Sequence, residues 1–171
     1  MNVLVGELLT LSRLEAGVTG EQEMVDLGEM LAVIVDDARF EGAARKVAVD
    51  CKADEMPEIM ANPELLHRAI ENIVRNALRF SPEGGVVNIT AGVSGEHICL
   101  RVSDSGPGVP EAELESIFQP FFRTGEQSSG GGYGLGLAIA KRVIAAINGT
   151  ISAKNANQGG LIVEVVLNFT D

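Results

Sequence analysis

Four polar residues repeat along one segment of the chain at helical spacing: Arg68, Asn72, Asn76 and Arg79. Steps of four, four and three place them on one stripe of a helix. Asparagine amide oxygens can ligate a hard cation such as Mg²⁺, and arginines can bind phosphate. Two asparagines one turn apart are poor helix formers, so a chemical role is one interpretation of the stripe. The alternative is a polar, solvated helix face.

A second candidate site is the segment Asp104-Ser105-Gly106-Pro107-Gly108, which follows an apolar alternating stretch. A carboxylate at the end of a strand can accept a hydrogen bond from an amino group of a ligand. The two glycines would let the backbone approach that ligand closely. The alternative is an ordinary turn.

A third candidate is the glycine-rich run from Gly130 to Gly136, which directly precedes an apolar helical segment. Free N–H groups and the positive end of the dipole at such a helix start favour an anion. No lysine follows at the place a phosphate-binding P-loop requires, and the run follows a loop, unlike a Rossmann turn. A flexible linker is the alternative.

Three phenylalanines fall within five residues in the segment Ile117-Phe118-Gln119-Pro120-Phe121-Phe122-Arg123. They predict either core packing or an aromatic hinge that anchors a mobile loop and docks a partner.

The elements that position these motifs follow from hydrophobic periodicity and from turn residues. Residues 106–136 hold 8 of the 20 glycines and three of the six prolines, which predicts a long functional loop. Asn62-Pro63 is a helix start, with a capping side chain and proline at the first helical position. We predict helices over 3–14, 27–40, 62–80 and 135–147, and strands over 21–26, 47–51, 87–93, 98–102, 150–154 and 161–167. This mixture predicts an α+β two-layer sandwich, with one mixed sheet and three helices on one face.

Composition limits the function. The chain has 171 residues, of which 46% are hydrophobic, so it is long and apolar enough to fold around a core. Its 24 acidic and 13 basic residues give a net charge of -11, which argues against nucleic acid. Residues 1–60 hold 13 acidic and 5 basic residues, so an anion site is expected in the remainder.

The cysteines and histidines show no metal-binding spacing, so Cys51 and Cys99 are expected to be two buried free thiols. The chain shows no signal peptide and no apolar run of membrane-spanning length, so the polypeptide as given is expected to be soluble.

Taken together and in this order, the motifs resemble the catalytic, ATP-binding domain of bacterial sensor histidine kinases. That family belongs to the gyrase/Hsp90/histidine-kinase/MutL superfamily. The resemblance covers about residues 22–169: it includes the N box at 72–76, the first glycine box at 104–108, the F box at 117–123, the second glycine box at 132–137 and a third at 159–160. Residues 7–15 resemble the end of the second helix of the dimerisation and phosphoacceptor domain. We therefore expect residues 1–20 to be a stub of that domain and residues 21–171 to be the catalytic domain. The sequences of residues 62–66, 71–79 and 120–124 are similar to those of Cpx-type envelope-stress kinases.

The resemblance implies a Bergerat-type ATP-binding fold with ATP and Mg²⁺ as ligands. Asn76 would ligate Mg²⁺, Asn72 would support the phosphate and metal shell, and Arg79 would contact phosphate. Phe80 would stack beside the adenine, at a place where the family usually has tyrosine. Asp104 would accept the adenine amino group.

The rest of the implied nucleotide site comes from the glycine boxes and from a lid over about 110–133. Lid residues 124–129 contain no arginine or lysine, so Arg123 would be the lid's cation. The further nucleotide-binding residues implied are Gly106, Gly108, Val109, Arg123, Gly132, Tyr133, Gly134, Leu135, Gly136 and Leu137.

The residue at position 72 bears on the reaction. Superfamily members that hydrolyse ATP carry a glutamate one turn before the metal asparagine, where it activates water. Asn72 occupies that place and cannot act as a base, while Glu71 lies about 100° around the helix. The resemblance therefore implies transfer of the γ-phosphoryl group to a protein histidine, with slow hydrolysis at best.

Neither His67 nor His97 is followed directly by an acid, as in the His-Glu or His-Asp pattern of the family's phosphoacceptor. We therefore expect a piece of a larger inner-membrane sensor, lying on the cytoplasmic side, that binds ATP but does not autophosphorylate alone. Its expected partners are its own dimerisation domain in a homodimer and a cognate response regulator, and this piece would be monomeric or weakly dimeric. The alternatives are a serine kinase or ATPase of the same fold, such as an anti-sigma factor, and a degenerate docking module that uses the Phe118–Phe122 surface.

Overall fold

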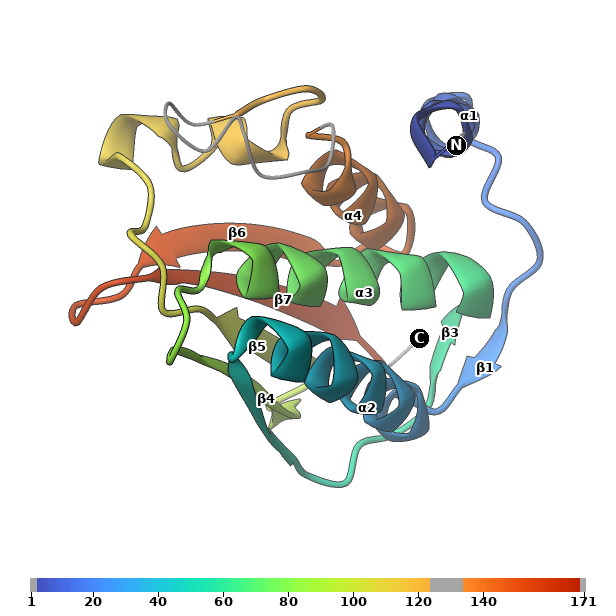
Figure 1. Ribbon diagram of the computed structural model, residues 1–171. Helices are drawn as coiled ribbons and strands as arrows, with labels where there is room; N and C mark the ends of the chain where they lie inside the picture. The colour runs from blue at the N-terminus through green and yellow to red at the C-terminus, as the bar shows by residue number, and fades with distance from the viewer. Residues whose placement is uncertain (1–2, 124–133, 170–171) are drawn as a thin grey trace.

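The computed structural model describes residues 3–123 and 134–169 as a mixed sheet with helices on one face (Figure 1). Five strands form the main sheet in the order β2-β4-β5-β7-β6. Strands β2 and β4 are parallel, and the other neighbours are antiparallel. These strands are β2 (Ala48–Ala53), β4 (Val86–Ser94), β5 (His97–Ser103), β6 (Thr150–Asn155) and β7 (Leu161–Asn168). The predicted α+β two-layer sandwich is confirmed.

Three helices cover one face of this sheet and bury its apolar residues (Figure 1). They are α2 (Leu27–Arg45), α3 (Pro63–Phe80) and α4 (Gly136–Ala146). Helix α3 begins as predicted, because the Asn62 side chain accepts a hydrogen bond from the Leu65 N–H at 3.0 Å. Its predicted apolar face is buried, which places its polar stripe beside α4 and the start of the long loop.

The structure differs from the prediction in two elements. Helix α2 was expected to end at Phe40 but continues to Arg45, because Gly42 is buried against Leu78 and Val47 and the chain turns only at Lys46 (φ 58). A second, two-stranded sheet pairs β1 (Glu23–Val25) with β3 (Ile59–Ala61), whose uniformly apolar sequence shows no alternation. The expectation of a single sheet was therefore wrong.

The long glycine-rich segment contains two short 3₁₀ turns, Glu111–Glu113 and Ser116–Phe118. Phe118 is buried and Phe121 is 55% exposed, so the aromatic segment provides both a core residue and a surface residue. The two cysteines are free thiols, but both are half-buried rather than buried as predicted.

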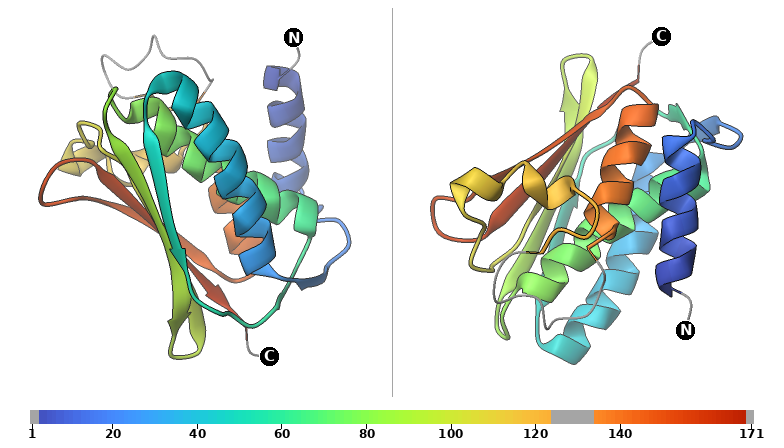
Figure 2. Two further views of the ribbon diagram at one scale, coloured as in Figure 1. Left: turned by 60° about the horizontal axis from the view of Figure 1, so that its bottom comes forward. Right: turned by 90° about the horizontal axis from the view of Figure 1, so that it is seen from above.

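Helix α1 (Val3–Glu15) lies outside the helical layer and runs beside α4 (Figure 2). Leu11 and Leu14 of α1 are buried. Arg68 of α3 donates a hydrogen bond to Thr10 Oγ1 at 2.6 Å, and Arg142 of α4 forms an ion pair with Glu15 at 3.2 Å. Among the described residues, no helix is both long and apolar enough to cross a membrane.

Candidate functional site

The polar stripe of α3 meets the glycine-rich start of α4. The Asn72 Nδ2 group donates a hydrogen bond to the Gly136 carbonyl oxygen at 3.1 Å. A Cβ on Gly136 would lie 3.5 Å from the Asn72 Cβ, so the two helices are in close contact there. Asn72 of the N box and Gly136 of the second glycine box, 64 residues apart in the sequence, are therefore direct neighbours.

Asn76 and Arg79 lie on the next turns of α3. Asn76 Oδ1 accepts a hydrogen bond from Arg79 Nη2 at 3.0 Å. An amide oxygen suits Mg²⁺, which usually takes one or two protein oxygens and completes its shell with water and substrate phosphates. Within residues 3–123 and 134–169, no three His, Cys, Asp or Glu side chains form a group that could hold a metal. Asn76 Oδ1 is an oxygen that could hold a magnesium ion arriving with a phosphate ligand.

Several arginines lie around Arg79 despite the acidic composition of the chain. Burial lowers the pKa of Arg79, and the positive charges of Arg123, Arg45 and Arg75 lower it further. Arg45, at the end of α2, donates a hydrogen bond to the Arg79 carbonyl oxygen at 3.0 Å. A cluster of arginines held together at a helix end is a favourable environment for a polyanion.

One acidic side chain of α1 faces this cluster. Burial raises the pKa of Glu7, while the positive charges of Arg68, Arg75 and Arg79 oppose that rise. The carboxylate of α1 and the basic residues of α3 therefore share one partly desolvated region.

Phe80 ends α3 beside the arginine cluster. The Arg79 guanidinium lies 4.9 Å from the centre of the Phe80 ring, at the distance of a cation–π contact. A Cβ on Gly106 would lie 2.5 Å from the Phe80 carbonyl oxygen, so only glycine permits this approach of the loop to the helix end.

Asp104, at the end of β5, is 7% exposed. Its Oδ1 accepts hydrogen bonds from the Gly106 N–H at 2.9 Å and from the Leu161 N–H at 3.0 Å. Burial raises the pKa of Asp104, and the two backbone hydrogen bonds oppose that rise. Within the described part of the chain, both hydrogen bonds of this carboxyl end on Oδ1. The other oxygen, Oδ2, is therefore the atom available to an amino group of a ligand.

The loop after Asp104 is fastened at several points that the sequence motifs did not reveal. Ser81 Oγ accepts a hydrogen bond from the Ser105 N–H at 3.0 Å, and the Ser105 hydroxyl bonds the backbone of Val86. Asn155 pairs with the backbone of Val109. Sequence reasoning missed Arg45, Ser81 and Asn155, because each acts on a backbone group distant in sequence.

The second glycine box is only partly described. The Gly134 carbonyl oxygen accepts a hydrogen bond from the Phe121 N–H at 2.9 Å, which joins this box to the F box. Leu135 is buried, and Leu137 is half-buried against the core. Gly132 and Tyr133, also predicted to bind nucleotide, lie outside the described residues, and Arg123 is the last described residue before that gap.

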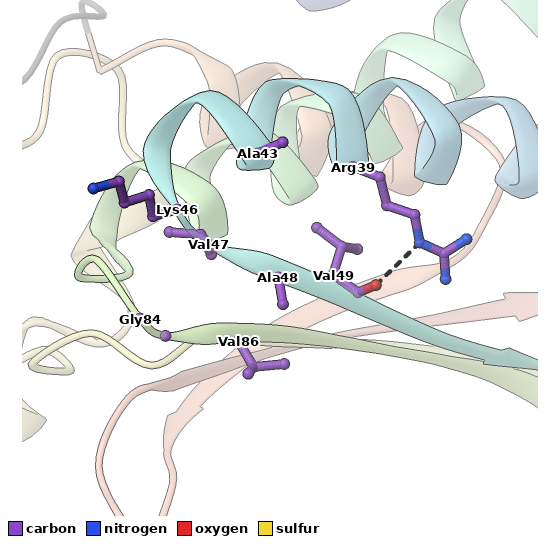
Figure 3. A pocket seen from close by; sticks show the side chains of 9 residues that line it. Arg39, Ala43, Lys46, Val47, Ala48, Val49, Gly84 and Val86 are labelled. Carbon is purple, nitrogen blue, oxygen red and sulfur yellow. Dashed lines mark hydrogen bonds between the residues drawn. The ribbon is translucent and has the colours of Figure 1, made fainter.

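A hollow of about 470 Å³ lies between α2 and β2, and its lining includes Arg39, Lys46 and Gly84 (Figure 3). Arg39 Nε donates a hydrogen bond to the Val49 carbonyl oxygen at 3.1 Å. The guanidinium of Arg39 therefore protects a backbone group of the edge strand β2. The predicted nucleotide residues in the described chain do not line this hollow.

Residues 61–171 match the model of the "Histidine kinase-, DNA gyrase B-, and HSP90-like ATPase" family. The chain is 36% identical to the sensor protein KdpD of Rathayibacter rathayi over 168 residues, which is 98% of this chain and 19% of KdpD. It is 33% identical to the sensor histidine kinase CpxA of Escherichia coli K12 over 165 residues, 94% of this chain and 35% of CpxA. The crystal structure of full-length ShkA in complex with AMPPNP matches with a TM-score of 0.84 at 27% identity, covering 98% of this chain and 35% of that chain. The chain thus spans about a fifth to a third of the length of these proteins.

Proposed function

The chain belongs to the histidine kinase-, DNA gyrase B- and HSP90-like ATPase family, and from that premise we propose that it is the ATP-binding kinase domain of a sensor histidine kinase. It transfers the γ-phosphoryl group of ATP to a histidine of a dimerisation domain. The similarity to sensor proteins over almost the whole chain supports this proposal.

Asp104 recognises the base. Its Oδ2 accepts the adenine amino group, while the backbone hydrogen bonds of Gly106 and Leu161 fix the carboxyl in place. Phe80 stacks beside the adenine, and Gly106, Gly108 and Val109 form the adjoining wall.

The phosphates lie between the end of α3 and the start of α4. Arg79 and Arg123 contact the phosphate oxygens, and Gly134 to Leu137 offer N–H groups at the helix start. Asn76, whose Oδ1 accepts from Arg79 in the structure, would hold the magnesium ion that comes with ATP, and Asn72 would support the same shell. The metal supplies electrostatic stabilisation of the transferring group.

The single observation that carries the reaction type is the contact between Asn72 and Gly136. An amide, which cannot accept a proton, stands where hydrolases of the superfamily place a general base, and its Nδ2 is tied to the Gly136 carbonyl oxygen at 3.1 Å. Glu71 turns away and lies 3.6 Å from His67. The site therefore binds and orients ATP without activating water.

The phosphoacceptor comes from outside the described structure. His67 lies beside Glu71 and His97 bonds Asn168 Oδ1 at 2.6 Å, both apart from the nucleotide residues. We propose that residues 1–20 end the dimerisation domain, that residues 21–171 form the catalytic domain, and that the whole protein is a homodimeric inner-membrane sensor. Its catalytic domain lies in the cytoplasm and serves a response regulator.

The test is to express the chain with a histidine-bearing helical hairpin restored before residue 1 and to incubate it with Mg²⁺ and γ-labelled ATP. We expect acid-labile, base-stable phosphate on the protein, and none in an Asn76→Ala variant. Acid-stable phosphate would instead support the serine kinase, and ATP binding without any phosphoprotein would support the docking module.

A further inference from the structure

We propose that Asn155 is a positioning residue for nucleotide binding, which holds the far end of the adenine wall in place. The inference rests on the proposed function, because it assigns a role around the same site. It starts from Asn155, the last residue of β6, whose side chain reaches into the loop that follows Asp104.

The Asn155 side chain satisfies both backbone polar groups of one loop residue. Asn155 Oδ1 accepts a hydrogen bond from the Val109 N–H at 2.9 Å, and Asn155 Nδ2 donates to the Val109 carbonyl oxygen at 2.6 Å. An amide is the side-chain group that offers a donor and an acceptor side by side in this way. Val109 is thereby fixed to the sheet, although it lies 46 residues away in sequence.

The cross-strand partner of Asn155 holds the other end of the same loop. Asn155 is in register with Leu161 of β7. The Leu161 N–H donates to Asp104 Oδ1, and the Asp104 N–H donates to the Leu161 carbonyl oxygen, each at 3.0 Å. One pair of residues in the β6–β7 hairpin therefore anchors both Asp104 and Val109.

The fit around Asn155 is tight on the loop side. Gly108 has a φ of +76, and a Cβ at that position would lie 2.6 Å from Asn155 Oδ1. The amide therefore sets how close the glycine backbone comes to the hairpin. Because Gly108 and Val109 belong to the proposed adenine wall, the geometry of that wall depends on Asn155.

Loss of this amide frees Val109 while Leu161 still holds Asp104. The base-specific contact stays available, but the wall beside it loses its second anchor. Binding must then order the freed Val109 backbone, and the entropy cost of fixing one residue corresponds to a decrease in adenosine affinity of roughly 5- to 30-fold. The phosphate residues on α3 and α4 do not contact Asn155 in the described structure, so affinity for tripolyphosphate should stay unchanged.

The experiment compares Asn155→Ser with the isosteric Asn155→Asp, in which a carboxylate oxygen faces the Val109 carbonyl. Exposed Asn157, two residues further in the same hairpin, supplies the matched control Asn157→Ser. Calorimetry gives the Kd for adenosine and for tripolyphosphate, and the melting temperature of each variant is recorded.

We expect both Asn155 variants to bind adenosine roughly 5- to 30-fold more weakly, with tripolyphosphate affinity and Asn157→Ser unchanged. Unchanged adenosine affinity in either folded variant overturns the role of Asn155. An equal loss of affinity for adenosine and tripolyphosphate overturns it too, because it indicates that Asn155 only stabilises the fold. Wild-type protein that fails to bind adenosine overturns the proposed function itself, so the two failures are distinguishable.

Discussion

Replacing Asp104 with asparagine isolates the proposed base contact, because the change preserves shape and removes charge. The amide oxygen of an asparagine can still accept both backbone hydrogen bonds that end on Oδ1, from Gly106 and Leu161. The amide nitrogen then occupies the place of Oδ2, where the adenine amino group must donate. Two donors face each other, so the variant loses the hydrogen bond and leaves a donor unsatisfied.

The magnitude follows from these two losses. A hydrogen bond to a charged group contributes about 1.5–3 kcal/mol, and an unsatisfied buried donor costs about 1–3 kcal/mol. Allowing for partial relaxation, we expect a loss of about 3 kcal/mol in nucleotide binding, which is roughly a 100-fold increase in Kd. Stability should not fall, because burial raises the pKa of Asp104 and the carboxylate is thus costly to bury in the free protein.

The assay is a calorimetric titration of ATP and adenosine into the wild type, Asp104→Asn and a control, Asp50→Asn, which changes an exposed acid on β2. Melting temperatures are measured in parallel. A Kd for Asp104→Asn within threefold of the wild type refutes the assigned contact. A lower melting temperature that accompanies weaker binding refutes the claim that the carboxyl serves binding rather than folding.

Three further predictions concern charge. Because burial raises the pKa of Asp104, adenosine affinity of the wild type should fall as pH is lowered, at a pH above the ordinary aspartate range. The affinity of Asp104→Asn should not change with pH. Equal pH dependence of adenosine affinity in both proteins contradicts the assignment of Asp104 to the base contact. Arg79→Ala should raise the Kd for ATP by roughly 10-fold and change the Kd for adenosine much less. The control is Arg101→Ala, on the opposite face of the sheet. Equal effects of Arg79→Ala on both ligands argue against a phosphate contact. Because burial raises the pKa of Glu7, its stabilising contribution is present at low pH and lost as pH rises through that pKa. Glu7→Gln should therefore melt at a higher temperature than the wild type at pH 7 and at the same temperature below about pH 4, and a lower melting temperature at pH 7 shows that attraction to the arginines dominates.

Local signals predicted the parts of the fold that local interactions determine. Asn62 and Pro63 start α3 where the sequence placed its start, and the apolar face of that helix is buried as its periodicity indicated. The end of α2 was misplaced, since burial of Gly42 against Leu78 is a tertiary contact that no helical period contains. β3 was missed because its sequence, Ile-Met-Ala, is apolar throughout and shows no alternation, although its burial alternates.

The candidate site also contains residues that local patterns predicted and residues that they did not. Asn72 and Gly136 could be grouped because each lies in a motif with its own local pattern. Asn155 and Arg45 could not, because each bonds a backbone group that any residue carries, across 46 and 34 positions of sequence. Such contacts leave no mark on the composition of either partner, so only the folded chain reveals them.

Helix α3 connects the contact with α1 to Arg79. Arg68 holds α1 near one end of it, and Arg79 stands 11 residues further on, about 16 Å away along the axis. A tilt of about 5° around Arg68 would displace Arg79 by about 1.4 Å, as the rise per residue of a rigid helix dictates. Misplacement by about 1 Å can change a rate of group transfer by about 100-fold. A small rotation of α1 that tilts α3 would therefore move the proposed phosphate contact of Arg79.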